Sequence, residues 1–343
     1  MSLIGDFQRE SKKQNQRGRC LHYDRGTRCN NIISAHSIQK KGQLSLIAEN
    51  GHVYCLSADL SILRKTDGKP LPKITGINDA STFYGFCKHH DNELFKPIDD
   101  HPLTPDKKQI ALYAYRCICK ELFVKENAIS VLEKFINHPE VHPEIQVLVS
   151  NVYYGNRVGF AGLQYHKKLY DEAFLSEDYD QFEFLYFTCS TQCNAQFSGL
   201  LYPDFDFVGR ELQDLSEANK PLDLITFFTA PIKDGWAFGF AWHVSSNSTC
   251  IPFIQSLAHI VSMGQNPEDA ILRFALSCCE NHAIRISWWN ELNKKQKKVA
   301  LERMQMMANP TEPVPQNYLS SGCEGVANWA FEGIHTTLQI VSD

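Results

Sequence analysis

Side chains that can bind zinc lie in two short segments near the start of this 343-residue chain, separated by a long gap. They are Cys20, Cys29 and His36 in the first segment and Cys87, His89 and His90 in the second. Zinc is bound tetrahedrally by thiolates and imidazoles, and a site assembled from two distant segments closes a loop that would otherwise lack a core. The pattern therefore predicts a zinc site.

Short strands and turns are expected to position these side chains. The stretch between Cys20 and Cys29 is rich in turn-forming residues and suits a loop with one ligand at each end. The run 32–36 reads as a strand that ends at His36, and 83–86 as a strand that leads into a helix carrying the second ligand pair. Between them we expect a short helix within 38–50, ended by Gly51, and a strand over 52–56.

Composition and length describe an ordinary globular protein. The chain is 43% hydrophobic and 21% charged, and its length allows two or three domains. The polar residues 1–19 contain no apolar stretch typical of a signal sequence, and no segment approaches the ~20 apolar residues of a membrane span. We expect a cytoplasmic protein without membrane contact, whose twelve cysteines are reduced thiols or metal ligands.

Positive charge is concentrated at the N-terminal end. Residues 1–48 hold nine basic and three acidic side chains, a net charge of +6 that leaves −11 for the rest of the chain. A basic segment on an acidic body is typical of nucleic-acid binding, because neutralised phosphates supply affinity for any sequence. A solvated basic surface is the alternative. The candidate DNA- or RNA-binding residues are Arg17, Arg19, Arg25, Arg28, Lys40 and Lys41.

Residues 18–98 resemble a treble-clef zinc finger, a ββα-type fold whose best-known catalytic members are the HNH endonucleases. The resemblance rests on Ser34-Ala35-His36-Ser37-Ile38, which is similar to the family's strand-end histidine. It rests also on Phe86-Cys87-Lys88-His89-His90-Asp91, which is similar to the family's helix-start motif. Cys87 and His90 are three positions apart, so both can reach one metal while the backbone turns. The predicted structural zinc set is Cys20, Cys29, Cys87 and His90, with His36 as a fifth candidate that would displace one of them.

The resemblance also implies chemistry. In HNH nucleases the strand-end histidine activates water for attack on a phosphodiester, and a divalent cation such as Mg²⁺ stabilises charge on the phosphate. His36 would be that general base and Asp91 a ligand of the cation. One turn after Asp91 the family has a second ligand, whereas this chain has Phe95; His89, Asn92 or Asp99 are the candidates to replace it.

The remainder of the chain predicts helices followed by an antiparallel sheet. Apolar residues recur at helical spacing over 107–137 and 144–174, and strand patterns cover 182–187, 222–228 and 236–242. Helices follow over 250–263, over 267–280 and from Ser287, the expected cap. The aromatic stripe Trp236, Phe238, Phe240 and Trp242 is expected to be one face of a buried sheet. We find no established catalytic signature in this half.

These patterns predict an α+β protein with four parts: a basic tail (1–17), a treble-clef zinc module (18–104), a helical linker (105–178) and an α+β domain (179–343). Two functions are consistent with them. The first is an HNH-like nuclease of the bacterial defence or restriction type, whose C-terminal domain binds a protein partner or a second copy. The alternative is a non-catalytic zinc protein that binds nucleic acid or protein.

Overall fold

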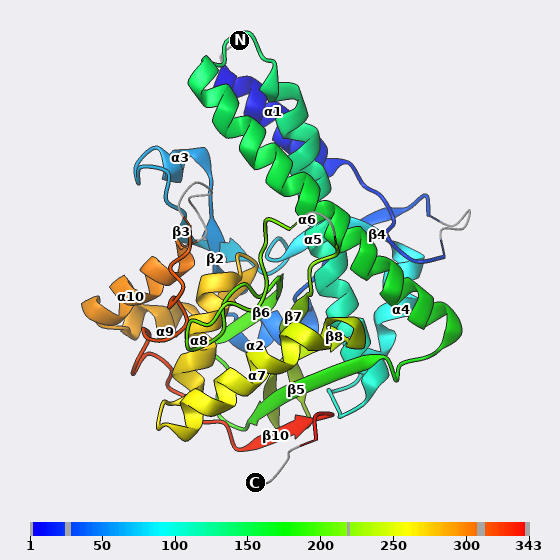
Figure 1. The fold of residues 1–343 in the computed structure, drawn as a ribbon, viewed down its shortest axis with the longest axis vertical. Coiled ribbons are helices and arrows are strands. Elements are labelled where there is room, and N and C mark those ends of the chain that lie inside the picture. Colours follow the sequence, from blue (N-terminus) through cyan, green and yellow to red (C-terminus); the bar gives the residue numbers. More distant parts are fainter. Residues whose placement is uncertain (1–2, 25–28, 218–219, 307–312, 340–343) are drawn as a thin grey trace.

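The computed structural model describes residues 3–24, 29–217, 220–306 and 313–339, and its architecture is α+β. An antiparallel sheet of eight strands in the order β10-β5-β8-β7-β6-β9-β2-β3 forms the body (Figure 1). The strands are β2 (His52–Ser57), β3 (Leu71–Gly76), β5 (Phe182–Cys189), β6 (Ala195–Leu201), β7 (Ile225–Ile232), β8 (Gly235–His243), β9 (His282–Ile284) and β10 (Gly333–Thr336).

Helices cover both faces of this sheet. Alternate residues of β8 point to opposite sides: Phe238 and Phe240 pack in one core with α7 (Asn247–Ser262) and α8 (Pro267–Cys278), whereas Ala237 and Ala241 belong to the core around α5 (Lys107–Ile136). Two-sided burial explains why the strands are apolar almost throughout. The expected aromatic stripe is confirmed as a buried face, with Trp236, Phe238, Phe240 and Trp242 each 3% exposed or less.

The helical middle segment is confirmed as a hairpin of two long helices, α5 and α6 (Pro143–Ser176). Asp106 caps α5 by accepting a hydrogen bond from the backbone N–H of Gln109, and His142 caps α6. The first residues, expected as a tail, instead form helix α1 (Leu3–Gln16), whose Phe7 packs edge-on against Phe135 of α5 at 5.3 Å. Together α1, α5 and α6 extend from the body as an arm (Figure 1).

The expected boundary at residue 104 does not separate two sheets. Strands β2 and β3 come from the N-terminal segment, yet β9 pairs with β2 on one side and with β6 on the other. Side chains join the same parts: the Asn281 amide donates to Ser37 Oγ at 2.7 Å and accepts from Ser81 Oγ at 2.7 Å. The open edge of β2 is completed by β9, a pairing that local patterns do not contain.

Two local expectations differ from the structure. The stretch 38–50 contains a π-helical turn (Lys40–Leu44) and the short α2 (Ser45–Ile47), and another short helix, α3 (Leu60–Leu63), precedes β3. Ser287 does not cap a helix but donates its hydroxyl to the Glu49 carboxylate. The region consists of α9 (Ile286–Glu291) and α10 (Lys294–Met304), the latter with an Asn293 capping box. A 3₁₀ turn (Val244–Ser246) precedes α7.

All twelve cysteines are free thiols, and most are buried. Burial raises the pKa of Cys193 to about 12, typical of an inert core thiol. Among the helices that the structure describes, none combines the length and the apolar character needed to cross a membrane.

The buried His282 of β9 predicts acid sensitivity. Burial lowers its pKa from 6.5 to about 4, and its Nδ1–H donates to the Cys279 carbonyl. Between these pH values the unfolded chain binds a proton that the folded chain does not, so this residue makes stability rise with pH. We expect the free energy of unfolding, measured with urea, to rise less steeply from pH 4.5 to 6.5 in His282→Gln than in the wild type. His52→Gln, at an exposed position, serves as the control; equal slopes in all three proteins would contradict the assignment.

Candidate metal centre

A strand pair and the helix that follows it build the candidate site. Strand β1 (Ile32–His36) pairs antiparallel with β4 (Thr82–Cys87), which places Ile32 opposite Cys87, and α4 (Lys88–Asp99) begins immediately afterwards. Cys87 is the N-cap of α4, and its Sγ accepts a hydrogen bond from the backbone N–H of His90 at 3.4 Å. The turn into the helix therefore brings the side chains of Cys87 and His90 to the same place.

The first ligand segment is held against β4 by backbone hydrogen bonds. The N–H of Arg19 donates to the Tyr84 carbonyl at 3.0 Å, and the N–H of Leu21 donates to the Gly85 carbonyl at 2.8 Å. From α5, the Tyr115 hydroxyl donates to the Leu21 carbonyl at 3.0 Å. These contacts fix Cys20 beside the end of β4, where Cys87 lies.

Four potential ligands converge as the sequence predicts. One ligand atom from each of Cys20, Cys29, Cys87 and His90 lies within 4.8 Å of the others. The Nδ1 atom of His90 is 3.3 Å from the Sγ of Cys20 and 3.5 Å from the Sγ of Cys29. Ligand atoms around tetrahedral zinc, at bond lengths of about 2.0–2.3 Å, are separated by roughly 3.3–3.8 Å. The donor set and its spacing fit one zinc ion.

The surroundings of the cluster suit a structural site. Among the described residues, Cys20, Cys87 and His90 are buried and Cys29 is half-buried, an enclosure typical of structural zinc sites. The His22 ring stacks on the His90 ring at 3.9 Å, which fixes the orientation of the imidazole. Burial raises the pKa of the Cys20 thiol, because a thiolate there lacks solvation, and a bound cation would supply the missing opposite charge.

The predicted general base, His36, lies outside this cluster, at the end of β1 opposite Thr82. Its Nε2 is 2.9 Å from the Ile77 carbonyl oxygen. Because a carbonyl oxygen only accepts, Nε2 carries the proton and Nδ1 keeps its lone pair. The ring is half-buried, and burial lowers its pKa; the nearby Lys40 acts in the same direction and the Ile77 hydrogen bond in the opposite one. The imidazole is therefore neutral at neutral pH.

Asp91, the predicted ligand of a catalytic cation, lies in the first turn of α4 beside His90. Its Oδ1 atom is buried and has no hydrogen-bond partner among the described residues. Burial raises the pKa of this carboxyl group to about 6; the charge of Arg116 opposes this shift, and that of Asp99 adds to it to a smaller extent. A buried acceptor without a partner is costly and calls for a donor or a cation.

A buried arginine that the sequence patterns did not indicate influences Asp91 electrostatically. Arg116 of α5 is 2% exposed, and its guanidinium forms two hydrogen bonds with the Asp99 carboxylate at 2.9 and 3.0 Å. The same group lies over the Phe95 ring at 4.0 Å, and its Nε atom has no partner among the described residues. The only available signal was a single basic residue within the apolar run 110–118.

The candidate nucleic-acid residues differ in availability. Arg19 is folded against α5, where it pairs with Glu126 and its guanidinium lies 4.2 Å from the centre of the Phe123 ring. Arg17 also pairs with Glu126 at 3.1 Å. Lys40 and Lys41 are exposed on the π-helical turn after β1. Arg25 and Arg28 lie outside the described residues.

No family model matches this chain, and comparisons with curated proteins and with solved structures also gave no match. The functional assignment therefore depends on the chemistry of the site.

Removal of one ligand tests the zinc set. We expect Cys87→Ala to lower zinc content from about one ion per chain to near zero and to lower the free energy of unfolding by ~4 kcal/mol, because the metal links segments distant in sequence. Elemental analysis of the purified protein and urea unfolding measure the two effects. Cys55→Ala, a half-buried thiol on β2, is the matched control and should keep its zinc. Full zinc occupancy in Cys87→Ala would exclude this ligand set.

Proposed function

We propose that this protein is a zinc-containing, HNH-like nuclease whose head is a treble-clef module. The β1–β4 pair followed by α4 supports this fold, because the four ligands lie where a ββα-type zinc finger needs them: two on the preceding loop and two at the helix start. The zinc ion bound there is structural. We assign hydrolysis of a phosphodiester to a second centre, in which His36 would be the general base and Asp91 a ligand of the cation.

The proposal depends mainly on the tautomer and the protonation of His36. A general base needs a fixed orientation and a free lone pair, and the Nε2–H bond to the Ile77 carbonyl provides both by leaving Nδ1 unprotonated. Burial lowers the pKa of His36, so the ring is in its basic form at neutral pH. Lys40, exposed on the turn that follows, adds positive charge for a phosphate.

The reaction would proceed by hydrolysis. His36 Nδ1 takes a proton from a water molecule as the water oxygen attacks phosphorus, and the bond from phosphorus to the leaving oxygen breaks, that oxygen then taking a proton from solvent. The buried Oδ1 atom of Asp91 fits a hard cation such as Mg²⁺, because it is an acceptor without a protein partner. A cation there would stabilise negative charge on the phosphate.

A specific observation favours the second candidate function, a non-catalytic zinc protein that binds nucleic acid or another protein. Phe95 fills the position one turn after Asp91, is fully buried and packs edge-on against Phe86 at 5.1 Å. One turn further along the same face of α4, the Asp99 carboxylate is already hydrogen-bonded to Arg116. In this alternative the carboxylate of Asp91 is balanced by Arg116 alone.

Comparison of wild type with His36→Ala separates the two functions. We expect the wild type to cleave plasmid DNA or structured RNA in the presence of Mg²⁺, Mn²⁺ or Ni²⁺, and His36→Ala to be ~10²–10⁴-fold slower, the usual contribution of a general base. Zinc content should be unchanged, because His36 lies outside the ligand cluster. His52→Ala, another histidine bonded to a backbone carbonyl, is the matched control and should stay active.

Each result has a separate meaning. Absence of cleavage by the wild type with every metal and both substrates would contradict nuclease function and favour the binding protein. Loss of zinc in His36→Ala would instead assign His36 to the structural centre.

Asp91→Asn tests the cation site independently. The substitution removes the negative charge and keeps the shape, so we expect cleavage to require at least ~10-fold more divalent cation, a loss typical of a weakened metal site. Titration of activity with Mg²⁺ measures this. Asp100→Asn, at the exposed end of α4, is the matched control. An unchanged Mg²⁺ requirement in Asp91→Asn would remove Asp91 from the proposed reactive centre.

A further inference from the structure

Three side chains form a closed ring of hydrogen bonds at the end of the strand that carries His36. The Asn281 amide N–H donates to the Ser37 hydroxyl at 2.7 Å, and that hydroxyl lies 2.8 Å from the Ser81 hydroxyl. The Ser81 hydroxyl donates to the amide oxygen of Asn281 at 2.7 Å. Ser37 follows β1 and Ser81 precedes β4, whereas Asn281 lies between α8 and β9. The ring therefore joins the end of the β1–β4 pair to the body.

The contacts allow only one arrangement of protons in this ring. The Asn281 amide nitrogen also donates to the Ser198 carbonyl at 2.9 Å, and since a carbonyl oxygen only accepts, this contact identifies the nitrogen side of the amide. The Ser81 proton is directed to Asn281, so the Ser37 hydroxyl donates to Ser81. Ser81 Oγ accepts a further bond from the backbone N–H of Ile38 at 3.0 Å. A network whose donors all have acceptors holds its members rigidly.

Ser81 has a backbone conformation that depends on such support. Its φ angle is +59°, in the left-handed region that residues with a side chain seldom adopt. The backbone N–H of Ser37 donates to the Ser81 carbonyl at 2.9 Å, and the ring holds the side chain of the same residue. Unfavourable conformations of this kind persist where the surroundings determine them, and they are frequent at functional sites.

The turn that ends at Ser81 also carries the group that orients His36. This turn connects β3 to β4, and its Ile77 carbonyl accepts the hydrogen bond from His36 Nε2 at 2.9 Å. Through Ser37, Asn281 binds the backbone next to the imidazole. Through Ser81, it binds the turn that contains the accepting carbonyl. One amide group thus holds both parts of the chain that determine where the imidazole lies.

We propose that Asn281 is a positioning residue for His36, through which the C-terminal body holds the general base in its reactive orientation. Asn281 acts through Ser37 and Ser81 and not on the substrate. The effect on reaction rate rests on the proposed nuclease function, whereas the orientation of the imidazole can be measured without it. The inference gives the body a role in catalysis, because residues 18–104 alone lack the third member of the ring.

Exchange of the His36 ring proton with water, measured by NMR of ¹⁵N-histidine-labelled protein, tests the orientation. The His36 signal is identified by its absence from His36→Ala. We expect Asn281→Leu, which has a similar shape but no hydrogen-bonding group, to speed exchange of the Nε2 proton at least ~10-fold, because its bond to Ile77 opens more often. Ser37→Ala removes one hydroxyl and is a milder second variant that should change exchange in the same direction.

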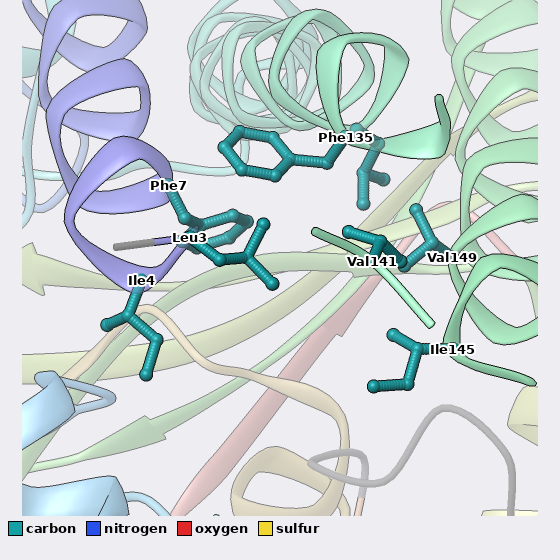
Figure 2. A pocket seen from close by; sticks show the side chains of 8 residues that line it. Leu3, Ile4, Phe7, Phe135, Val141, Ile145 and Val149 are labelled. Atoms are coloured by element: carbon teal, nitrogen blue, oxygen red, sulfur yellow. The ribbon is translucent and has the colours of Figure 1, made fainter. Parts of the chain in front are cut away.

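Phe7→Ala is the control for a general loss of stability. Phe7 lines an apolar hollow of about 220 Å³ between α1, the end of α5 and the start of α6, as Figure 2 shows. Its truncation removes buried contacts in the arm and none in the ring, so exchange of the His36 proton and cleavage should both stay unchanged. Circular dichroism and zinc content show that each variant is folded.

Cleavage kinetics test the consequence for the reaction. We expect Asn281→Leu to lower kcat by ~10–100-fold and to leave KM within ~3-fold of the wild-type value, since a slightly displaced catalytic group has an effect of this size. In the His36→Ala background the same substitution should cause no further loss, because it acts only through the imidazole.

The possible failures are distinct. A wild type that cleaves no substrate contradicts the proposed function, and faster exchange of the His36 proton in Asn281→Leu still supports the positioning role. Unchanged exchange in both Asn281→Leu and Ser37→Ala overturns that role even when the wild type is active. An equal change in Phe7→Ala, or a further loss of rate in the double variant, overturns it as well.

Discussion

Convergence of three thiols and one imidazole at the start of α4 is the constraint on which the N-terminal part of the structure depends. The ligands come from a loop before β1 and from the junction of β4 with α4, so a metal ion bound by them would close a loop that contains β1, β2 and β3. Since β2 and β3 belong to the eight-stranded sheet, the same ion would tie the head to the body. Three free thiols and one imidazole this close together are a donor set typical of structural zinc sites.

Helix α5 is the second organising element, because it contacts both the metal module and the sheet. Its apolar side packs on β6 and β7, while Tyr115 reaches the first ligand segment and Arg116 reaches α4. The guanidinium of Arg116 is hydrogen-bonded to Asp99 and is also influenced by the charge of Asp91. Whether Asp91 binds a cation or is only balanced by this arginine decides between the two proposed functions. His36 is unaffected by that choice, since the Ile77 carbonyl orients it.

Sequence reasoning succeeded where local chemistry determines structure. The four converging ligands were identified from residue type and spacing, and β1, β4 and the long helices followed from apolar periodicity. Sequence reasoning failed where contacts between segments far apart in the chain determine the structure. Helix α1 forms because Phe7 meets Phe135, Ser287 bonds Glu49 instead of capping a helix, and β9 joins β2 to β6. Arg116 was missed because a lone charge in an apolar helix gives no sign of which carboxylates it will meet.

X-ray absorption at the zinc edge of the purified chain tests the central claim most directly, since it reports the ligand atoms themselves. The account predicts a four-coordinate site with three sulfur ligands at about 2.3 Å and one imidazole nitrogen at about 2.0–2.1 Å. Coordination by nitrogen and oxygen alone, by fewer than three sulfurs, or a chain that takes up no zinc on reconstitution would contradict it.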